Sequence, residues 1–184
     1  MKSKDPGRKA GEKNYRYQLE SVEVLEDASR IQSPMIRKFF NWWRSFGPEL
    51  PGIDAFDSFP HDELQPNIFR VDVIGEGRFL FGGRGHMARM ILGGKNTGSE
   101  FSTNLTEASS QFEQENAKLA QYYATVAKNR LCSHCQGTLM TLNFMDIGFE
   151  SLDAPLGNAH GDITHIVGII DTNPSNILGE TEML

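Results

Sequence analysis

The chain has 184 residues, of which 39% are hydrophobic and 23% charged, and its net charge at pH 7 is −6. These proportions are typical of a folded globular protein, and the length predicts one domain with a single core rather than a disordered or multidomain chain. The sequence has no apolar run of the roughly 18 residues that a transmembrane helix needs, and its first residues lack a signal-peptide core, so we expect a cytoplasmic protein without a membrane partner.

The two ends of the chain are predicted to be flexible. Positions 1–16 carry six basic and two acidic side chains, an excess of four positive charges, which leaves a net charge of −10 for the rest. Residues 1–18 also show no apolar face, which predicts a basic, flexible arm. The acidic body repels phosphate backbones, so we expect no nucleic-acid partner. Residues 172–184 follow the last strand pattern and are predicted to form a flexible tail.

The first predicted helix spans residues 33–46. Ser33 is a suitable N-cap before Pro34, and Gly47-Pro48 ends the pattern. Its aromatic stripe includes Phe39, Trp42, Trp43 and Phe46. We expect this stripe to pack on the domain's own sheet; the alternative occupant is a second copy of the chain, which would make these four residues a homodimer interface. Upstream, residues 19–25 form an apolar run without a clear period, and its role stays open.

Two short strands follow the helix. Hydrophobic and polar residues alternate over 69–73 and again over 79–81. Gly75-Glu76-Gly77 lies between them and offers the positive φ angles that a hairpin turn requires. These residues therefore predict an antiparallel hairpin.

One long helix and three strands complete the pattern. A glycine-rich segment, 82–85, leads into a short helix, and Thr106 caps a long helix predicted over 107–130. Strands are predicted over 139–147, 149–156 and 163–170. Because strands and helices are segregated rather than alternating, the pattern predicts an α+β domain, from about residue 19 to 171, with an antiparallel sheet.

The order of several short motifs resembles the PAS-fold proteins, in particular a small bacterial branch that is often a whole protein. The motifs are Trp42-Trp43-Arg44, Leu50-Pro51, Asp57, Pro60, Arg78-Phe79-Leu80-Phe81, Gly85, Gly93, Thr97-Gly98, Ser151-Leu152-Asp153-Ala154-Pro155-Leu156 and Asp162-Ile163. The resemblance covers residues 36–171. It implies a five-stranded antiparallel sheet with helices over one face, a ligand cavity between them, and a role in signal transduction with a small-molecule ligand or a signalling-protein partner.

The edge of the implied cavity departs from the family pattern. Gly82 stands where such proteins commonly have an arginine, and Arg84 and His86 are close enough in sequence to replace it. His165 shares one face of the last strand with Ile163 and Val167, so it is a further candidate. The predicted pocket residues are Arg84, His86, Met87, Met90, Tyr123, Met140, Phe144 and His165.

Cys132, His134 and Cys135 offer two thiols and an imidazole, which weakly suggest a metal or redox site. Structural zinc requires four ligands, and the sequence has no second cysteine pair. In a strand the two cysteines would point to opposite faces, whereas in a turn they could converge. The sequence favours ordinary reduced cysteines and no metal.

The cofactor remains unknown from sequence, but two are not expected. Flavin photosensors of the PAS fold have a reactive cysteine in an Asn-Cys-Arg motif near the helix after the second strand, and this segment has no cysteine. Haem-binding relatives commonly place a histidine on the long helix, and residues 107–130 contain none. His86 stays open as a haem ligand.

The sequence predicts a non-enzymatic sensor. It contains no nucleophile elbow, phosphate-binding loop or metalloprotease motif. We expect ligand occupancy to shift how the Trp42/Trp43 helix packs on its neighbours. The first alternative is an interaction scaffold with a filled core. The second is an enzyme, which would need convergent polar groups with shifted pKa values in the pocket.

Overall fold

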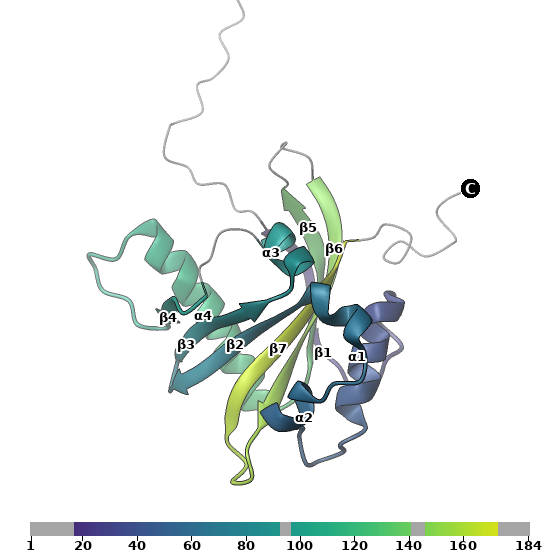
Figure 1. Cartoon of the computed structure of the whole chain (residues 1–184). Coiled ribbons are helices and arrows are strands. Elements are labelled where there is room, and N and C mark those ends of the chain that lie inside the picture. Colours follow the sequence, from purple (N-terminus) through teal and green to yellow (C-terminus); the bar gives the residue numbers. More distant parts are fainter. Residues whose placement is uncertain (1–16, 93–96, 141–145, 173–184) are drawn as a thin grey trace, which may run out of the picture.

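The protein forms one seven-stranded antiparallel sheet with helices packed against it (Figure 1). The computed structural model describes residues 17–92, 97–140 and 146–172. The order across the sheet is β1-β5-β6-β7-β2-β3-β4. The strands are β1 (Tyr17–Val24), β2 (Ile68–Gly75), β3 (Arg78–Arg84), β4 (Glu100–Ser102), β5 (Ser133–Met140), β6 (Asp146–Gly157) and β7 (Ile163–Asp171). The α+β class is confirmed, and the expected count of five strands is wrong.

The two unexpected strands, β1 and β4, lie at the two edges, so β5, β6, β7, β2 and β3 form the continuous centre of the sheet. β1 pairs with β5, and its register shifts between Leu19 and Ser21. This bulge explains why residues 19–25 show no clear period, because an extra residue reverses the alternation of faces. β4 has only three residues, among them the buried Phe101, and is too short to give a periodic signal.

Helices cover both faces of the sheet, whereas the sequence predicted them on one. They are α1 (Pro34–Arg44), α2 (Ile53–Asp57), the 3-10 helix η1 (Asp62–Asn67), α3 (His86–Leu92) and α4 (Gln111–Asn129). α1 packs against β6 and β7 in one hydrophobic cluster, and α4 packs in a second cluster on the opposite face (Figure 1). Residues 149–157 of β6 and 166–171 of β7 are buried without interruption. Strands that are buried on both faces need a cover on each side, which α1 and α4 provide here.

Helix α1 forms where its capping residues and apolar stripe agree. The Ser33 side chain accepts a hydrogen bond from the Ile36 N–H at 3.3 Å, and Pro34 occupies the first turn. Ile36, Phe40 and other residues of the stripe are buried. The helix ends at Arg44, two residues before the predicted end, and Gly47 then adopts a φ of 64° that favours glycine.

Helix α4 begins later than predicted because a stronger N-cap follows Thr106. The Ser110 hydroxyl accepts from the Glu113 N–H at 3.2 Å, and the Glu113 carboxylate accepts from the Ser110 N–H at 2.6 Å. This reciprocal capping box fixes the start at Gln111. Thr106 instead takes part in a local turn with Ser109.

Some predictions fall partly outside the described residues. Residues 141–145 of the strand predicted over 139–147 are not described, and β5 already begins at Ser133. The predicted arm and tail are likewise outside, except that residues 17 and 18 belong to β1 and Thr172 follows β7.

Candidate functional site

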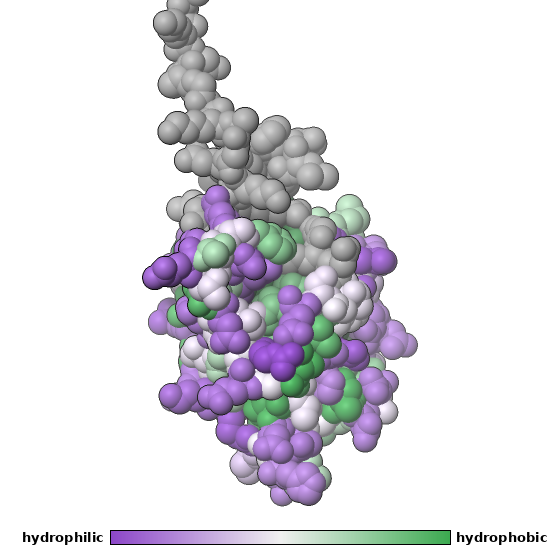
Figure 2. All heavy atoms as spheres, turned by 90° about the vertical axis from the view of Figure 1, so that its left-hand side faces the viewer, coloured by the Kyte–Doolittle hydropathy of each residue, from purple (hydrophilic) through white to green (hydrophobic). Residues whose placement is uncertain are grey.

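A cavity of about 290 Å³ lies between α4 and the sheet. Its lining side chains come from β1, β2, β3, α4, β5, β6 and β7, with Leu92 from α3; they are Leu19, Phe69, Phe81, Arg84, Leu92, Lys118, Leu119, Tyr122, Tyr123, Cys135, Phe149, Ser151, Asp153 and Ile170. Figure 2 views the side on which α4 and β4 lie and shows apolar surface gathered between polar side chains. A mostly apolar cavity with a few polar groups is the usual form of a small-molecule site.

The floor of this cavity depends on a glycine. Phe69 of β2 lies opposite Gly168 of β7, and a Cβ atom added to Gly168 would lie 2.0 Å from Phe69 Cζ. The absence of a side chain on β7 therefore gives the Phe69 ring its place over the sheet. Any other residue at position 168 would displace this ring.

Asp153 places a carboxyl group in this apolar wall. The residue is 3% exposed, and its Oδ2 accepts a hydrogen bond from the Tyr122 hydroxyl at 2.6 Å. Its Oδ1 has no hydrogen-bond partner among the described residues. Burial raises the pKa of Asp153 to about 7, and the hydrogen bond from Tyr122 opposes that rise. The carboxyl group therefore gains and loses its proton near neutral pH.

Tyr122 also connects Asp153 to Cys135. The Tyr122 hydroxyl lies 3.3 Å from Cys135 Sγ. Burial is the main cause that raises the pKa of Cys135 to about 12 and the pKa of Tyr122 well above its usual value. Both groups stay protonated at neutral pH, so they act as hydrogen-bond partners. Because the thiolate is the nucleophilic form, Cys135 is chemically inert here.

Arg84 lies at the far end of the same cavity. Asp153 pairs with Gly168, Gly168 with Phe69, and Phe69 with Arg84, so all four lie in one row across β6, β7, β2 and β3. Three strand spacings separate the two charged residues, or about 14 Å between their backbones. The Arg84 guanidinium carbon lies 5.1 Å from the centre of the Phe81 ring. Asp153 and Arg84 thus lie at opposite ends of this row, and Lys118 of α4 is the other charged side chain of the wall.

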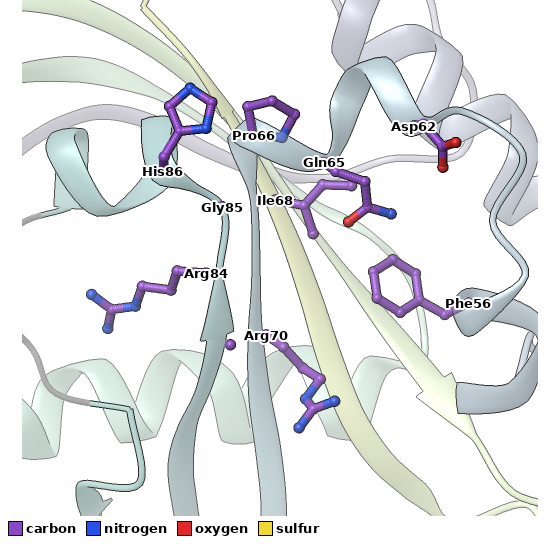
Figure 3. Close-up of a pocket in the computed structure, with 10 residues that line it drawn as sticks. Phe56, Asp62, Gln65, Pro66, Ile68, Arg70, Arg84, Gly85 and His86 are labelled. Atoms are coloured by element: carbon purple, nitrogen blue, oxygen red, sulfur yellow. The ribbon is translucent and has the colours of Figure 1, made fainter.

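A second hollow, of about 520 Å³, lies beside η1 and α3 (Figure 3). Arg84 and Arg70 border it, and their side chains point in opposite directions. Arg70 is held in an ion pair with Asp72 at 2.8 Å. Gly85 lets η1 approach closely, because a Cβ atom there would lie 2.1 Å from the Gln65 carbonyl oxygen. We assign this hollow to chain packing, since its polar groups do not converge on a common point.

The predicted pocket residues separate into two groups. Arg84 and Tyr123 line the cavity beneath α4. His86 is exposed and borders the second hollow, while Met87 is half-buried and Met90 is 71% exposed on α3. None of these three residues lines the cavity. The side chain of Met140 and the whole of Phe144 lie outside the described residues.

His165 lies on the face of the sheet opposite the cavity. Alternation along β7 directs Ile166 and Ile170 toward α4, so His165 points the other way with Val167 and Ile169. Its Nε2 lies 3.8 Å from the Asp72 carboxylate. Burial lowers the pKa of His165, and Asp72 opposes that change. The alternation in the sequence shows which residues share this face of β7 but not which helix covers the face.

The predicted interface residues are divided by burial. Phe39 is fully buried and Trp43 is 6% exposed, and the Trp43 indole N–H donates to the Pro155 carbonyl at 2.8 Å. These two belong to the core and are unavailable to a second chain. Trp42 is half-buried, with its ring 4.9 Å from that of Phe59, and Phe46 is 37% exposed.

Cys132 directly precedes β5 and Cys135 lies within it, and the two pack on opposite faces of the sheet, as expected for an extended segment. His134 shares the α1 face, where its Nε2 lies 2.6 Å from the Glu150 carboxylate. Glu150 also accepts from the N–H groups of Gln32 and Ser33, at 2.9 and 2.6 Å. Within the described ranges, no three His, Cys, Asp or Glu side chains are grouped to hold a metal ion.

Glu150 belongs to a buried polar cluster that sequence reasoning missed. We call Ser33, His134, Glu150 and Asp171 the Glu150 cluster; all four are at most 3% exposed. The Ser33 hydroxyl donates to the Asp171 carboxylate at 2.5 Å. The cluster fixes the N-terminus of α1 to the sheet.

Asp153 and Tyr122 were also missed as site residues. The signal that could have found them is an acidic residue inside a strand pattern that is otherwise apolar or small, as in Leu152-Asp153-Ala154. A buried charged residue demands a partner, and the long helix is the element that provides one.

None of the helices in the described part of the chain is long and apolar enough to cross a membrane.

Comparison with known proteins gives structural neighbours only. No protein-family model and no curated protein matches the chain. One similar solved structure is that of an RNA-binding light-oxygen-voltage receptor, with 14% sequence identity and a TM-score of 0.42. The match covers 73% of this chain and 34% of the receptor, so the chain spans about a third of the receptor's length. They also include the light state of the Aureochrome1 LOV blue-light photoreceptor (10%, TM-score 0.40), with coverage of 66% and 88%.

A third similar structure is a sensory box histidine kinase/response regulator from Burkholderia thailandensis (14% identity, TM-score 0.34), with coverage of 62% of this chain and 82% of that one. The five strands that the PAS resemblance implies lie adjacent in one antiparallel sheet, and the long helix packs on it, so the fold is PAS-like.

Proposed function

We propose that the chain is a sensory or regulatory domain that binds a small molecule in the cavity beneath α4 and catalyses no reaction. The observation that carries the proposal is the cavity itself, with a buried carboxyl group that lacks a partner on one oxygen among the described residues. Apolar walls supply binding energy, and a single polar group orients the ligand.

The two alternative functions fit this geometry less well. A pure interaction scaffold predicts a filled core beneath α4, and the cavity of about 290 Å³ argues against it. An enzyme needs convergent reactive groups, and Asp153 with its pKa of about 7 meets that need in part. The adjacent thiol has a pKa of about 12, so it supplies no nucleophile at neutral pH.

Ligand binding would be transmitted through α4 rather than through α1. Leu119, Tyr122 and Tyr123 of α4 line the cavity, and the hydrogen bond from Tyr122 to Asp153 ties the helix to β6. A ligand that contacts these residues favours one position of α4 over another. Leu19 also lines the cavity, so the edge strand β1 would respond with it. The Trp42/Trp43 helix lies on the other face and has no contact with the site.

Thermal unfolding in the presence of a broad metabolite library tests this proposal. We expect at least one compound to raise the midpoint of the wild-type protein, because a ligand that binds only the folded state stabilises it. Leu119→Trp places a larger ring at the cavity wall and should remove the shift. Gln121→Trp adds the same ring at an exposed position of α4 and should retain it. A wild-type midpoint that no compound changes argues against small-molecule sensing.

A further inference from the structure

We infer that the ligand of this cavity is a small, largely aromatic organic cation, such as a primary amine, whose N–H groups bind the carboxylate of Asp153. The inference rests on the proposed function and adds the chemical class of the ligand. It is carried by the geometry of Asp153, by the aromatic walls and by the charges at the two ends of the cavity.

The hydrogen bonds of Asp153 favour a donor as its partner. The Tyr122 hydroxyl donates to Oδ2, which leaves Oδ1 in the cavity wall without a partner among the described residues. An ionised carboxylate only accepts hydrogen bonds, and leaving a charged oxygen buried and unpartnered is costly. A ligand N–H group at Oδ1 would remove that cost, and a cationic one would also offset the buried charge.

The same strand shows what a carboxylate completed by the protein looks like. Glu150, three residues before Asp153, accepts from two backbone N–H groups and lies 2.6 Å from His134 Nε2. Asp153 has one donor, although both residues are buried. The protein therefore supplies partners for both oxygens of Glu150, whereas Oδ1 of Asp153 has none among the described residues.

The walls favour a flat, cationic molecule over an aliphatic anion. Phe69, Phe81, Tyr123 and Phe149 contribute aromatic rings to the cavity. Ring faces attract ammonium groups and stack on planar molecules. A volume of about 290 Å³ is at the lower end for ligand sites, which limits the ligand to about one or two rings.

Lys118, an exposed residue of α4, and Arg84 of β3 are the basic side chains of the wall, and Arg84 sets the polarity along the sheet. It lies three strands from Asp153 in the same row. A cation would therefore lie at the Asp153 end, and the end near Arg84 would take a neutral or hydrogen-bond-accepting group. A diamine would place its second charge near this guanidinium, so we expect a monoamine.

Titration calorimetry with three probes of matched size tests the inference: 2-phenylethylamine, 2-phenylethanol and phenylacetate. We expect the amine to bind the wild-type protein at least about tenfold more tightly than the alcohol or the acid, as for a buried charge pair. Asp153→Asn keeps the size and an acceptor oxygen but removes the charge, and should abolish this preference. Asp62→Asn makes the same change at an exposed position outside this cavity and should keep it. Circular dichroism confirms that each variant is folded.

The outcomes separate the two proposals. Equal or tighter binding of the alcohol or of phenylacetate overturns the cationic ligand and leaves the proposed function in place. Unchanged amine affinity in Asp153→Asn also overturns it, as does the absence of measurable amine binding to the wild-type protein. If, in addition, no library compound shifts the unfolding midpoint, the proposed function fails as well.

Discussion

The two faces of the sheet treat a buried carboxylate in opposite ways. Glu150 and Asp153 lie three residues apart on β6, so alternation directs them to different sides. On the α1 side, Glu150 is fully buried and bound by Gln32, Ser33 and His134. On the α4 side, Asp153 receives one hydrogen bond, from Tyr122, and borders a cavity.

This difference distinguishes a structural buried charge from one that is available to a ligand. Both carboxylate oxygens of Glu150 accept from backbone N–H groups, as buried polar groups in a finished core require, although His134 Nδ1 in the same cluster has no hydrogen-bond partner among the described residues. Asp153 violates the same rule within the described residues, and such violations concentrate at functional sites.

The largest expected effect is on the α1 face. Glu150→Ala removes the acceptor of two backbone N–H groups and leaves His134 buried without it. We expect the free energy of unfolding, measured by urea denaturation, to fall by about 3 to 5 kcal/mol. Glu49→Ala, at an exposed position, is the control and should change it little. A loss below about 1 kcal/mol at Glu150 would mean that the α1 face does not depend on this charge.

The second effect is a pH dependence on the α4 face. The pKa of Asp153 rises from 3.8 to about 7 on folding. An acid with a raised folded-state pKa stabilises the fold fully below the unfolded pKa and loses this contribution as pH rises through the folded pKa. The free energy of unfolding therefore decreases between about pH 4 and 7, by at most about 4 kcal/mol.

Asp153→Asn removes this dependence. We expect the variant to match the wild-type protein near pH 4 and to be the more stable of the two at pH 8, in urea denaturation across that range. Tyr122 and Cys135 face Asp153 and do not ionise in this window, because burial raises the pKa of both. Arg84 and Lys118 are the charged side chains of the cavity wall. Asp62→Asn tests the same change at an exposed site. A stability difference that is independent of pH would show that Asp153 is not strained in its ionised form.

The smallest effect tests the floor of the cavity. Gly168→Ala would place a Cβ atom 2.0 Å from the Phe69 ring and force it to move, so we expect a loss of about 1 to 3 kcal/mol. Gly148→Ala is the matched strand glycine, since its nearest neighbour is an oxygen at 4.0 Å. Thermal unfolding compares the two variants. Equal losses would mean that Gly168 has no special role in placing Phe69.

Much of the fold was predictable because its signals are local. The N-cap at Ser33, the hairpin through Gly75 and Gly77, and the alternation along the central strands depend only on neighbouring residues. The start of α4 was predicted wrongly although its signal is also local: Ser110 and Glu113 form a capping box, and Thr106 was chosen instead.

The candidate site was less predictable, because a pocket residue is defined by what covers it. Of the predicted pocket residues, Tyr123 and Arg84 line the cavity and His165 lies on the opposite face of the sheet; that any of them binds a ligand stays a prediction. Periodicity shows which residues share a face of a strand but not which helix lies over that face. The partner of Asp153 comes from α4, 31 residues away. The backbone partners of Glu150 come from the residues before α1, more than 100 residues away, and only His134 of β5 is nearer, at 16 residues.

The sequence by itself determined the α+β class, the strands β2, β3, β6 and β7 and the aromatic stripe of α1, since hydrophobic period and capping are properties of short segments. The tertiary structure alone decided that α1 and α4 take opposite faces, that β1 and β4 extend the sheet, and that Asp153 borders a cavity while Glu150 is enclosed. The physical reason is that burial and hydrogen-bond satisfaction depend on segments distant in the chain, which only folding brings together.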